Sequence, residues 1–547
     1  MRNEILPVQE RAIGGGLEGA SRLSNEMASW MPAIISPDRQ INRVKDLADA
    51  RGRDAVQNDG FAMGAVQTHR DSIVGSQFRL NAQPDWETIG ADEGWAEEFQ
   101  KVVEGRFNLI ADSENCYLDA SRTMTFTGMI RLAVGGFVMT GEVLATAEWM
   151  RAAFRPCSTA VQFVSPTRLS NPDNRPDEQN LRRGIVRNRF GAPQSYWIRS
   201  THPHDFYMAD TNAYSWVNVP AYKPWGRRQV IHVVDRLQPD QSRGISDMVA
   251  VLKTMRMTKK FQDITLQNAV VNASYAAAVE SELPSDLIYA SMGAGGGGMG
   301  GMLQQYLTAL QQYVGGGTHI AVDGVKMPHL FPGTKLNLKP MGTPGGVGTG
   351  FEESLMRHTA AGLGLSYEQF SRDYSKTNYS SARASMSETW KGMQGKKKNV
   401  ADRTATQVYS LWFEEDLNAG NIPLPSGRTI ADFYTDPVFR EALLRCSWIG
   451  ASRGQIDEMK ETQAAVLRIK SGLSTFETEC ARLGDDFRTV FRQRAREDKL
   501  AKSLGLQFDL GATKPGMNGA KNAMVKGDDK DENADDDQQE GNDDGDE

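Results

Sequence analysis

Cysteine is scarce in this 547-residue chain, which contains only Cys116, Cys157, Cys446 and Cys480. They lie far apart without a C-x-x-C spacing, so neither a zinc site nor a disulfide framework is expected, and a reducing cytosol is the expected place of synthesis. No run approaches about eighteen apolar residues, which argues against a membrane span. The N-terminal residues lack the apolar core of a signal peptide, so we expect no secretion.

Motifs for catalysis are also missing. The chain has no G-x-x-x-x-G-K-[ST], and no G-x-S-x-G elbow places a serine against a base, so neither a nucleotide-driven motor nor a hydrolase triad is expected, and energy for any mechanical work would come from another polypeptide. Gly293–Gly298 formally matches G-x-G-x-x-G, but a flexible glycine loop explains it better because no βαβ series accompanies it. His202, His204 and Asp205 resemble metal ligands, yet a proline separates the histidines and no further ligand cluster is visible. We therefore expect no cofactor, no metal and no enzyme.

Composition is ordinary for a soluble globular protein, with 39% hydrophobic and 24% charged residues. The length requires several subdomains rather than one core. The net charge of −7 is unevenly distributed, because residues 528–547 hold twelve acidic residues and one lysine, a charge of −11. Residues 1–527 consequently carry +4, which permits weak contact with nucleic acid but is too little for a tight, specific DNA binder.

Helical and strand patterns alternate along the first half. Residues 1–36 are expected to be loosely ordered, and a helical pattern with a break at Asn58–Gly60 runs from Gln40 to Val74. An apolar segment at Met124–Thr146 is interrupted by Gly135, Gly136 and Gly141. The short strands predicted next indicate a mixed α+β layer: Ala160–Val164, Gly184–Val186, Tyr196–Arg199 and Val230–Asp235.

A long helix is predicted after Gly244, with Ser246 as N-cap and a length of about 28 residues, or about 40 Å. One side of this helix carries Lys253, Arg256, Lys259 and Lys260. Behind it, Tyr275–Glu280 can leave the helix as a strand. A small strand–helix–strand unit is then expected, with a helix at Met302–Tyr313 and strands at His319–Val325 and Lys335–Leu338.

A second helix, Phe351–Gly362, leads to a polar loop at residues 371–378 that contains two cations, Arg372 and Lys376. Tyr379 opens a helix that continues to Leu417, and we expect a kink at Gly392 and Gly395 because glycine weakens a helix interior. This helix also carries Lys391, Lys396, Lys397 and Lys398.

Three more helices follow between Gln455 and Leu500, stopped by Gly472 and Gly484, and Ser474–Glu477 has the pattern of a capping box. Beyond Gly511 the chain lacks large apolar side chains, so we expect a disordered acidic tail. The simplest interpretation is a tail that only keeps the protein solvated. The more specific alternative is a tail that repels DNA or recruits a basic partner.

The stretch Leu365–Ser381 closely resembles the channel loop of portal proteins of lambda-like tailed bacteriophages. Further stretches between about residues 30 and 500 resemble the same family. They are Asn58–Phe61, Ile73–Gly75, Val164–Pro166, Leu169–Pro172, Arg243–Gly244, Ala361–Glu368, Ser447–Gly450 and Gly472–Glu477. The glycine run at 293–301 and the polyacidic tail depart from the family pattern.

The resemblance implies a ring-forming α+β portal fold with several subdomains. These are an N-terminal arm (1–36), a wing (37–245), a first stem helix (246–280), a small α/β clip (281–350), a second stem helix (351–370), a channel loop (371–378), a kinked helix and wing (379–454), a helical crown (455–511) and an acidic tail (512–547).

The implied function is a ring, commonly of twelve copies, at one capsid vertex of the virion, assembled from chains made in the bacterial cytoplasm. It would pass double-stranded DNA, without sequence preference, during packaging and ejection. Its partners would be the terminase motor, head-completion or tail connector proteins, and major capsid and scaffolding proteins. In a ring each cation is repeated around the axis, so all ten named lysines and arginines are candidate channel residues. The alternative is an oligomeric capsid scaffold or adaptor without a DNA channel.

Overall fold

The computed structural model describes residues 18–20, 27–203, 205, 215–275, 319–322, 325–328, 347–454 and 458–506. The chain divides into two compact units, Met1–Phe487 and Arg488–Glu547. The predicted strand at Tyr275–Glu280 beyond its first residue, the glycine loop, the helix Met302–Tyr313, the strand Lys335–Leu338 and the acidic tail lie outside the described residues.

The N-terminal helices follow the predicted helical pattern. α1 spans Pro37–Asn42, α2 Lys45–Asn58 and α3 Gly60–Ile73. The predicted break at Asn58–Gly60 is confirmed, because the Asp59 carboxylate accepts hydrogen bonds from the Phe61 and Ala62 amides and so caps α3. α4 (Glu93–Ala111) and α5 (Phe126–Thr140) complete this group.

The strands form small antiparallel sheets, as expected for an α+β chain. β1 (Arg79–Ala82) pairs with β11 (Cys446–Ile449), and β9 (His319–Val322) with β10 (Val325–Pro328), so the strand expected over His319–Val325 ends at Val322. Two larger sheets confirm the other predicted strands. The first has the strand order β3-β2-β8 and consists of β2 (Glu142–Trp149), β3 (Thr159–Phe163) and β8 (Val230–Val234). The second has the order β4-β5-β6-β7 and consists of β4 (Leu181–Arg182), β5 (Ile185–Arg187), β6 (Pro193–Arg199) and β7 (Trp216–Pro220).

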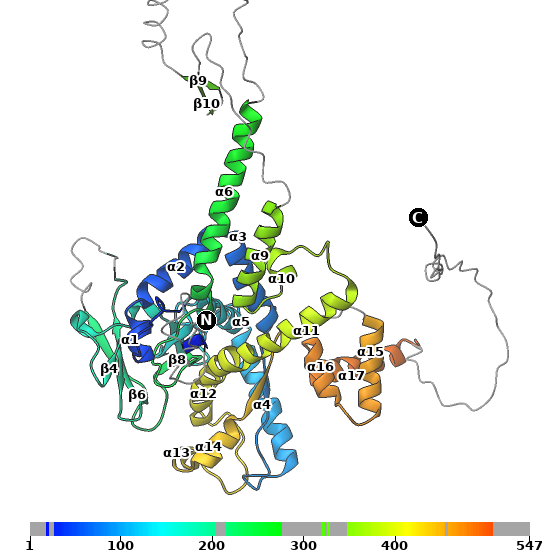
Figure 1. The fold of residues 1–547 in the computed structure, drawn as a ribbon. Coiled ribbons are helices and arrows are strands. Elements are labelled where there is room, and N and C mark those ends of the chain that lie inside the picture. The colour runs from blue at the N-terminus through cyan, green and yellow to red at the C-terminus, as the bar shows by residue number, and fades with distance from the viewer. Residues whose placement is uncertain are drawn as a thin grey trace, which may run out of the picture. The chain divides into compact units, whose positions relative to one another are not determined.

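The predicted long helix begins at Ser246, whose hydroxyl accepts a hydrogen bond from the Met248 amide. Its first turn, η5 (Asp247–Ala250), is a 3₁₀ helix, and α6 (Leu252–Tyr275) continues from it. Figure 1 shows α6 rising from beside α2, with α9 (Val347–Gly362) next to its base. A hydrogen bond of 2.6 Å from Gln262 to Glu352 and an edge-on contact between the Phe261 and Phe351 rings hold α6 and α9 together.

The helix expected over residues 351–370 is not continuous. α9 ends at Gly362, Gly364 takes a left-handed φ of 69°, and a separate helix α10 spans Tyr367–Ser371.

The remaining helices are α11 (Tyr379–Lys396), α12 (Arg403–Asn418), α13 (Ile430–Thr435), α14 (Pro437–Leu444), α15 (Glu458–Lys470), α16 (Phe476–Leu483) and α17 (Phe487–Ser503). Short 3₁₀ turns lie at Glu18–Ala20, Pro166–Arg168 and Pro172–Asn174.

α11 runs through Gly392 and Gly395 without interruption, and a π-helical turn follows them at Lys397–Asp402. The capping box expected at Ser474–Glu477 was wrong. Thr475 rather than Ser474 caps α16, accepting from the Thr478 amide. Glu477 is therefore free of the expected capping box and instead accepts a hydrogen bond of 2.8 Å from the Asn81 side-chain amide beside β11.

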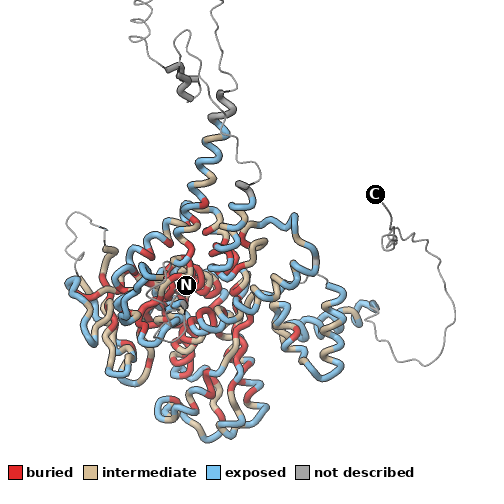
Figure 2. Tube along the Cα trace, viewed as in Figure 1, coloured by how far each residue is buried: buried red, intermediate tan, exposed pale blue. Residues whose placement is uncertain are grey.

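The core of the first unit is an aromatic cluster where α4, α5 and α12 meet β11. The Phe107 ring lies 5.1 Å from both Phe126 and Trp412 and 5.9 Å from Trp448. Trp412 is fully buried and packs within this cluster. Figure 2 shows buried residues in red through this region and exposed residues in blue along the outer part of α6.

Two glycines bring the base of α6 against the turn between α5 and β2. Gly141 ends α5 with a φ of 79°, and Gly244 lies so close to it that a Cβ at position 244 would be 1.9 Å from the Gly141 carbonyl oxygen. Only glycine tolerates this approach of two backbones. It places Arg243 directly against Glu142, the first residue of β2.

Glu142 and Arg243 form a fully buried ion pair. Arg243 donates to both Glu142 oxygens at 2.5–3.1 Å, and its remaining N–H groups donate to the carbonyls of Leu169, Arg183 and Pro166. Burial alone would raise the pKa of Glu142, but Arg243 and Lys45 hold it well below its usual value. The carboxylate therefore stays ionised.

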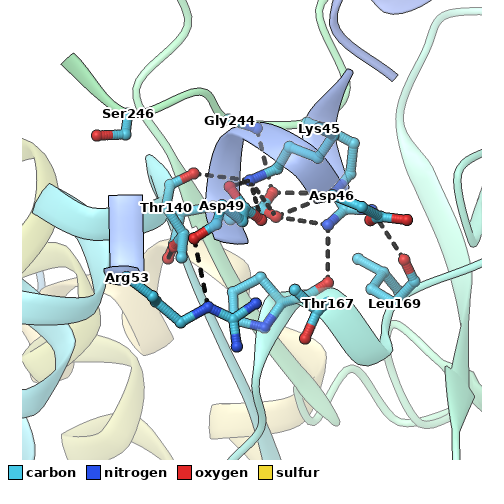
Figure 3. Close-up of polar contacts among 12 residues, drawn as sticks. Lys45, Asp46, Asp49, Arg53, Thr140, Thr167, Leu169, Gly244 and Ser246 are labelled. Atoms are coloured by element: carbon cyan, nitrogen blue, oxygen red, sulfur yellow. Dashed lines mark hydrogen bonds and ion pairs between the residues drawn. The ribbon is translucent and has the colours of Figure 1, made fainter. Parts of the chain in front are cut away.

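Lys45 joins this pair to α2. Its ammonium lies 3.4 Å from Glu142, contacts the Asp49 carboxylate at 2.7 Å and donates to the Thr140 carbonyl (Figure 3). Burial nevertheless raises the pKa of Asp49 to about 6. We call Lys45, Asp49, Glu142, His232 and Arg243 the buried charge cluster, because His232 also reaches Glu142 at 3.2 Å. The cluster connects α2, β2, β8 and the start of the long helix.

The variant Arg243→Ala is expected to lose about 3–5 kcal/mol of unfolding free energy, because it leaves Glu142 buried without its main partner. Chemical denaturation of the purified protein measures this loss. Arg175→Ala is the matched control: its partner Asp173 is exposed, and a change within about 0.5 kcal/mol is expected. Equal losses in the two variants would show that the buried pair does not hold the base of α6.

Candidate nucleic-acid interface

The predicted basic loop connects two well-capped helices. Ser366 and Gln369 form a capping box at the start of α10, and Arg372 ends that helix with a left-handed φ of 60°. Asn378 caps α11 by accepting a hydrogen bond from the Ser381 amide. The loop therefore spans residues 372–378, and its two ends are fixed by side-chain hydrogen bonds.

Both cations of the loop have a contact within the first unit. Arg372 is exposed and donates at 3.0 Å to the Thr68 hydroxyl of α3. Lys376 is exposed and pairs with Glu353 of α9, and this hydrogen bond raises the pKa of Lys376 and lowers that of Glu353. These surface contacts hold the loop beside α3 and α9, although an exposed pair contributes little to stability.

A cleft of about 330 Å³ brings the loop and α6 together. Its lining residues come from the α2–α3 junction, from Lys259 and Gln262 of α6, and from Phe370, Ser371 and Arg372. The Lys259 ammonium donates at 2.6 Å to the carbonyl of Asn58, the last residue of α2. Two predicted cations that are distant in sequence, Lys259 and Arg372, thus line one hollow.

The other predicted cations of α6 are also exposed. Lys253, Arg256 and Lys260 lie with Lys259 within an arc of about 120° around the helix at 3.6 residues per turn. Among the described residues, Lys253, Arg256 and Lys260 have no ion-pair partner. This side of α6 is therefore a mainly basic surface that reaches the cleft, with the exposed Asp263 lying within the same arc.

The four lysines of α11 and the π-helical turn do not form one basic surface. Lys391 and Lys398 are exposed, but Lys396 is half-buried and pairs with Asp247 at 2.8 Å. Lys397 is buried, where it pairs with Asp402 at 2.8 Å and donates to the Trp448 carbonyl. The expectation that Lys397 presents its charge on a surface is wrong for the single chain, because the π-helical turn directs it to Asp402 five positions later.

Lys396 also links the long helix to α3 through His69. The His69 Nδ1–H donates at 2.8 Å to the Ala65 carbonyl, and Nε2 accepts from the Lys396 ammonium at 3.3 Å. Burial and the nearby Lys396 charge lower the pKa of His69 to about 4. The contact chain Asp247–Lys396–His69 was not predicted, since nothing in the local sequence marks His69 as the partner of a lysine more than 300 residues away.

Acid should weaken the protein through His69. Its pKa falls from 6.5 in the unfolded chain to about 4 in the fold, so between these values the unfolded chain binds the extra proton and stability decreases as pH falls. The stability advantage of the wild type over His69→Gln should shrink by about 1 kcal/mol per pH unit below pH 6.5. Denaturant unfolding at several pH values measures it.

Asp49 has the opposite effect between its ordinary pKa and about 6, because there the folded chain binds the extra proton. Both proteins contain Asp49, so its contribution cancels in the comparison. Parallel stability curves for wild type and variant would contradict a neutral, buried His69.

No metal centre is evident in the part of the chain that the structure describes, where no three His, Cys, Asp or Glu side chains gather suitably. His204 lies outside that part. None of the described helices is long and apolar enough to cross a membrane.

Comparison with known proteins supports the resemblance. Residues 23–397 match the family described as phage portal protein, lambda family. The chain is 36% identical over 501 residues to portal protein B of Escherichia phage lambda, covering 91% of this chain and 92% of that protein. It is 38% identical over 501 residues to the portal protein of Escherichia phage N15, with the same coverage.

Solved structures with partial similarity come from gene transfer agent (GTA) particles. A chain of the virion of a native GTA particle is 11% identical, with 84% of this chain and 97% of that chain covered and a TM-score of 0.36. A chain of the neck of an empty GTA particle computed with C6 symmetry is 9% identical, with coverages of 83% and 96% and a TM-score of 0.39.

Proposed function

The chain belongs to the lambda family of phage portal proteins, and we propose that identical copies, commonly twelve, close into a ring at one capsid vertex of the virion. Double-stranded DNA passes through the ring during packaging and ejection. The ring docks the terminase motor and the head-completion or tail connector proteins, and it contacts major capsid and scaffolding proteins during assembly in the bacterial cytoplasm.

The observation that best supports a DNA-facing surface is the shared cleft of Lys259 and Arg372, with Lys253, Arg256 and Lys260 exposed on the same side of α6 as Lys259. Duplex DNA carries one negative charge per about 1.7 Å of its axis, and its phosphates look alike in every sequence. A surface of cations repeated around an axis suits contacts that are independent of sequence. The basic surface of α6 and the loop Arg372–Asn378 both fall within the residues that match the family.

The proposed contacts are weak and numerous. Residues 1–527 carry only +4, so a single chain attracts DNA poorly, whereas a ring adds the same exposed cations from every copy. Salt screens exposed charges beyond about 8 Å at physiological ionic strength, which keeps each contact local. DNA can then move past the ring without being arrested at one site. Lys391 and Lys398 are exposed and are included as candidate DNA contacts. Lys396 is also included, although it already pairs with Asp247. Lys397 is paired with Asp402 and contributes only if the π-helical turn rearranges.

Ring formation is tested by negative-stain images of the purified protein together with its mass. We expect closed rings with an open centre, and the mass gives the number of subunits. Monomers or rings with a solid centre would overturn the proposal. Rings with a solid centre would instead favour the alternative, a capsid scaffold or adaptor that conducts no DNA.

The double variant Arg372→Ala/Lys376→Ala is expected to reduce DNA packaging or retention while rings still assemble. Both side chains are exposed, so the change in stability should stay within about 0.5 kcal/mol. DNA protected from nuclease inside assembled particles measures the effect. Lys101→Ala/Arg151→Ala removes the same charge from two exposed positions and should package normally.

Normal packaging by the loop variant would reject a channel role for Arg372 and Lys376. An equal reduction in the control variant would show that total charge, rather than the position of these two cations, determines packaging.

A further inference from the structure

Helix α17 carries a basic stripe that the proposed DNA channel does not use. Arg492, Arg496, Lys499 and Lys502 fall within an arc of about 120° around this helix. All four are exposed, and none has an ion-pair partner among the described residues. At the same time, α17 has no buried residue. Four adjacent cations that form no ion pair with the described residues, including the neighbouring Asp498, repel one another and favour an anionic occupant.

The same chain contains a segment of complementary charge. Asp528–Glu547 carries −11, with acidic residues distributed along its whole length and no large apolar side chain. An occupant of this composition suits the basic stripe rather than the apolar positions Val490 and Leu500 on the same helix, which are also exposed. Charge therefore selects both the occupant and the side of α17 that it covers.

Chain length allows the two segments to meet. Residues 507–527 connect them, and a chain of that length spans up to about 70 Å when fully extended. α17 is about 25 Å long, so the acidic segment can reach every cation of the stripe. A tether this short gives an effective concentration in the millimolar range, which favours contact within one chain over contact between free molecules.

We propose that the acidic segment Asp528–Glu547 docks on the basic stripe of α17 in the same chain and competes there with other polyanions, including duplex DNA. The docked segment neutralises a site that would otherwise bind nucleic acid without sequence preference. Binding is electrostatic and reversible, so added salt releases it. The inference concerns the C-terminal unit alone and does not require a DNA channel elsewhere in the protein.

Carbodiimide coupling of the full-length protein tests the contact, since it joins a carboxylate to a lysine amine only where the two touch. Peptides that link residues 528–547 to Lys499 or Lys502 are expected several-fold more often than links to the exposed Lys101, and about 0.5 M salt should remove them. Equal coupling to Lys101 would overturn the proposal. In a mixture of light and heavy isotope-labelled protein, links only between unlike copies would overturn docking within one chain.

Binding of a labelled DNA duplex at fixed salt tests the competition. Truncation after Gly527 should tighten binding about tenfold, and replacing the acidic residues of the segment by their amides should have the same effect, because the segment acts through charge. The variant Arg492→Gln/Arg496→Gln/Lys499→Gln/Lys502→Gln should abolish that gain. A gain that persists without these four cations would show that the tail repels DNA in general, and unchanged binding after truncation would also overturn the proposal.

Discussion

The buried ion pair between Glu142 and Arg243 is the constraint on which the arrangement of the candidate interface depends. Removing two charges from water is costly unless each is paired and hydrogen-bonded, and here every Arg243 donor nitrogen reaches an acceptor within the fold. The contact is possible because Gly141 and Gly244 allow two backbones to approach. Since Arg243 directly precedes the long helix, the pair determines where the basic surface of α6 begins.

Helix α3 connects that surface to the other candidate elements. Thr68 accepts from Arg372 of the loop, and His69, the next residue, accepts from Lys396 at the end of α11. The loop and α11 thus contact two adjacent positions of α3, and the first turn of the long helix joins them indirectly, because Lys396 also pairs with Asp247. A shift of any one of these elements would disturb the others, so they are expected to move together.

Much of the fold could be predicted from residue patterns, because capping and periodicity act locally. Ser246, Asn58–Gly60 and the strands around Tyr196 and Val230 were all identified in this way. Features that depend on distant partners could not be predicted. Nothing near Lys397 shows that its charge meets Asp402 and the Trp448 carbonyl. The apparent capping box at Glu477 fails because Thr475 rather than Ser474 caps α16, and the Glu477 carboxylate accepts from the distant Asn81 instead.

The exposed cations of the cleft and of the loop beside it already have contacts inside the chain, and this affects how strongly they can hold DNA. Lys259 donates to a helix C-terminal carbonyl, Arg372 to a hydroxyl and Lys376 to a carboxylate. Each contact must be exchanged or shared when a phosphate approaches, so the net attraction per cation is smaller than for a free side chain. In the proposed ring, the cations of every subunit would share their hydrogen bonds between the chain and the DNA. This sharing would lower the free-energy barrier between neighbouring positions of the DNA. A channel that must both load and release its genome needs attraction that is repeated many times and strong at no single position.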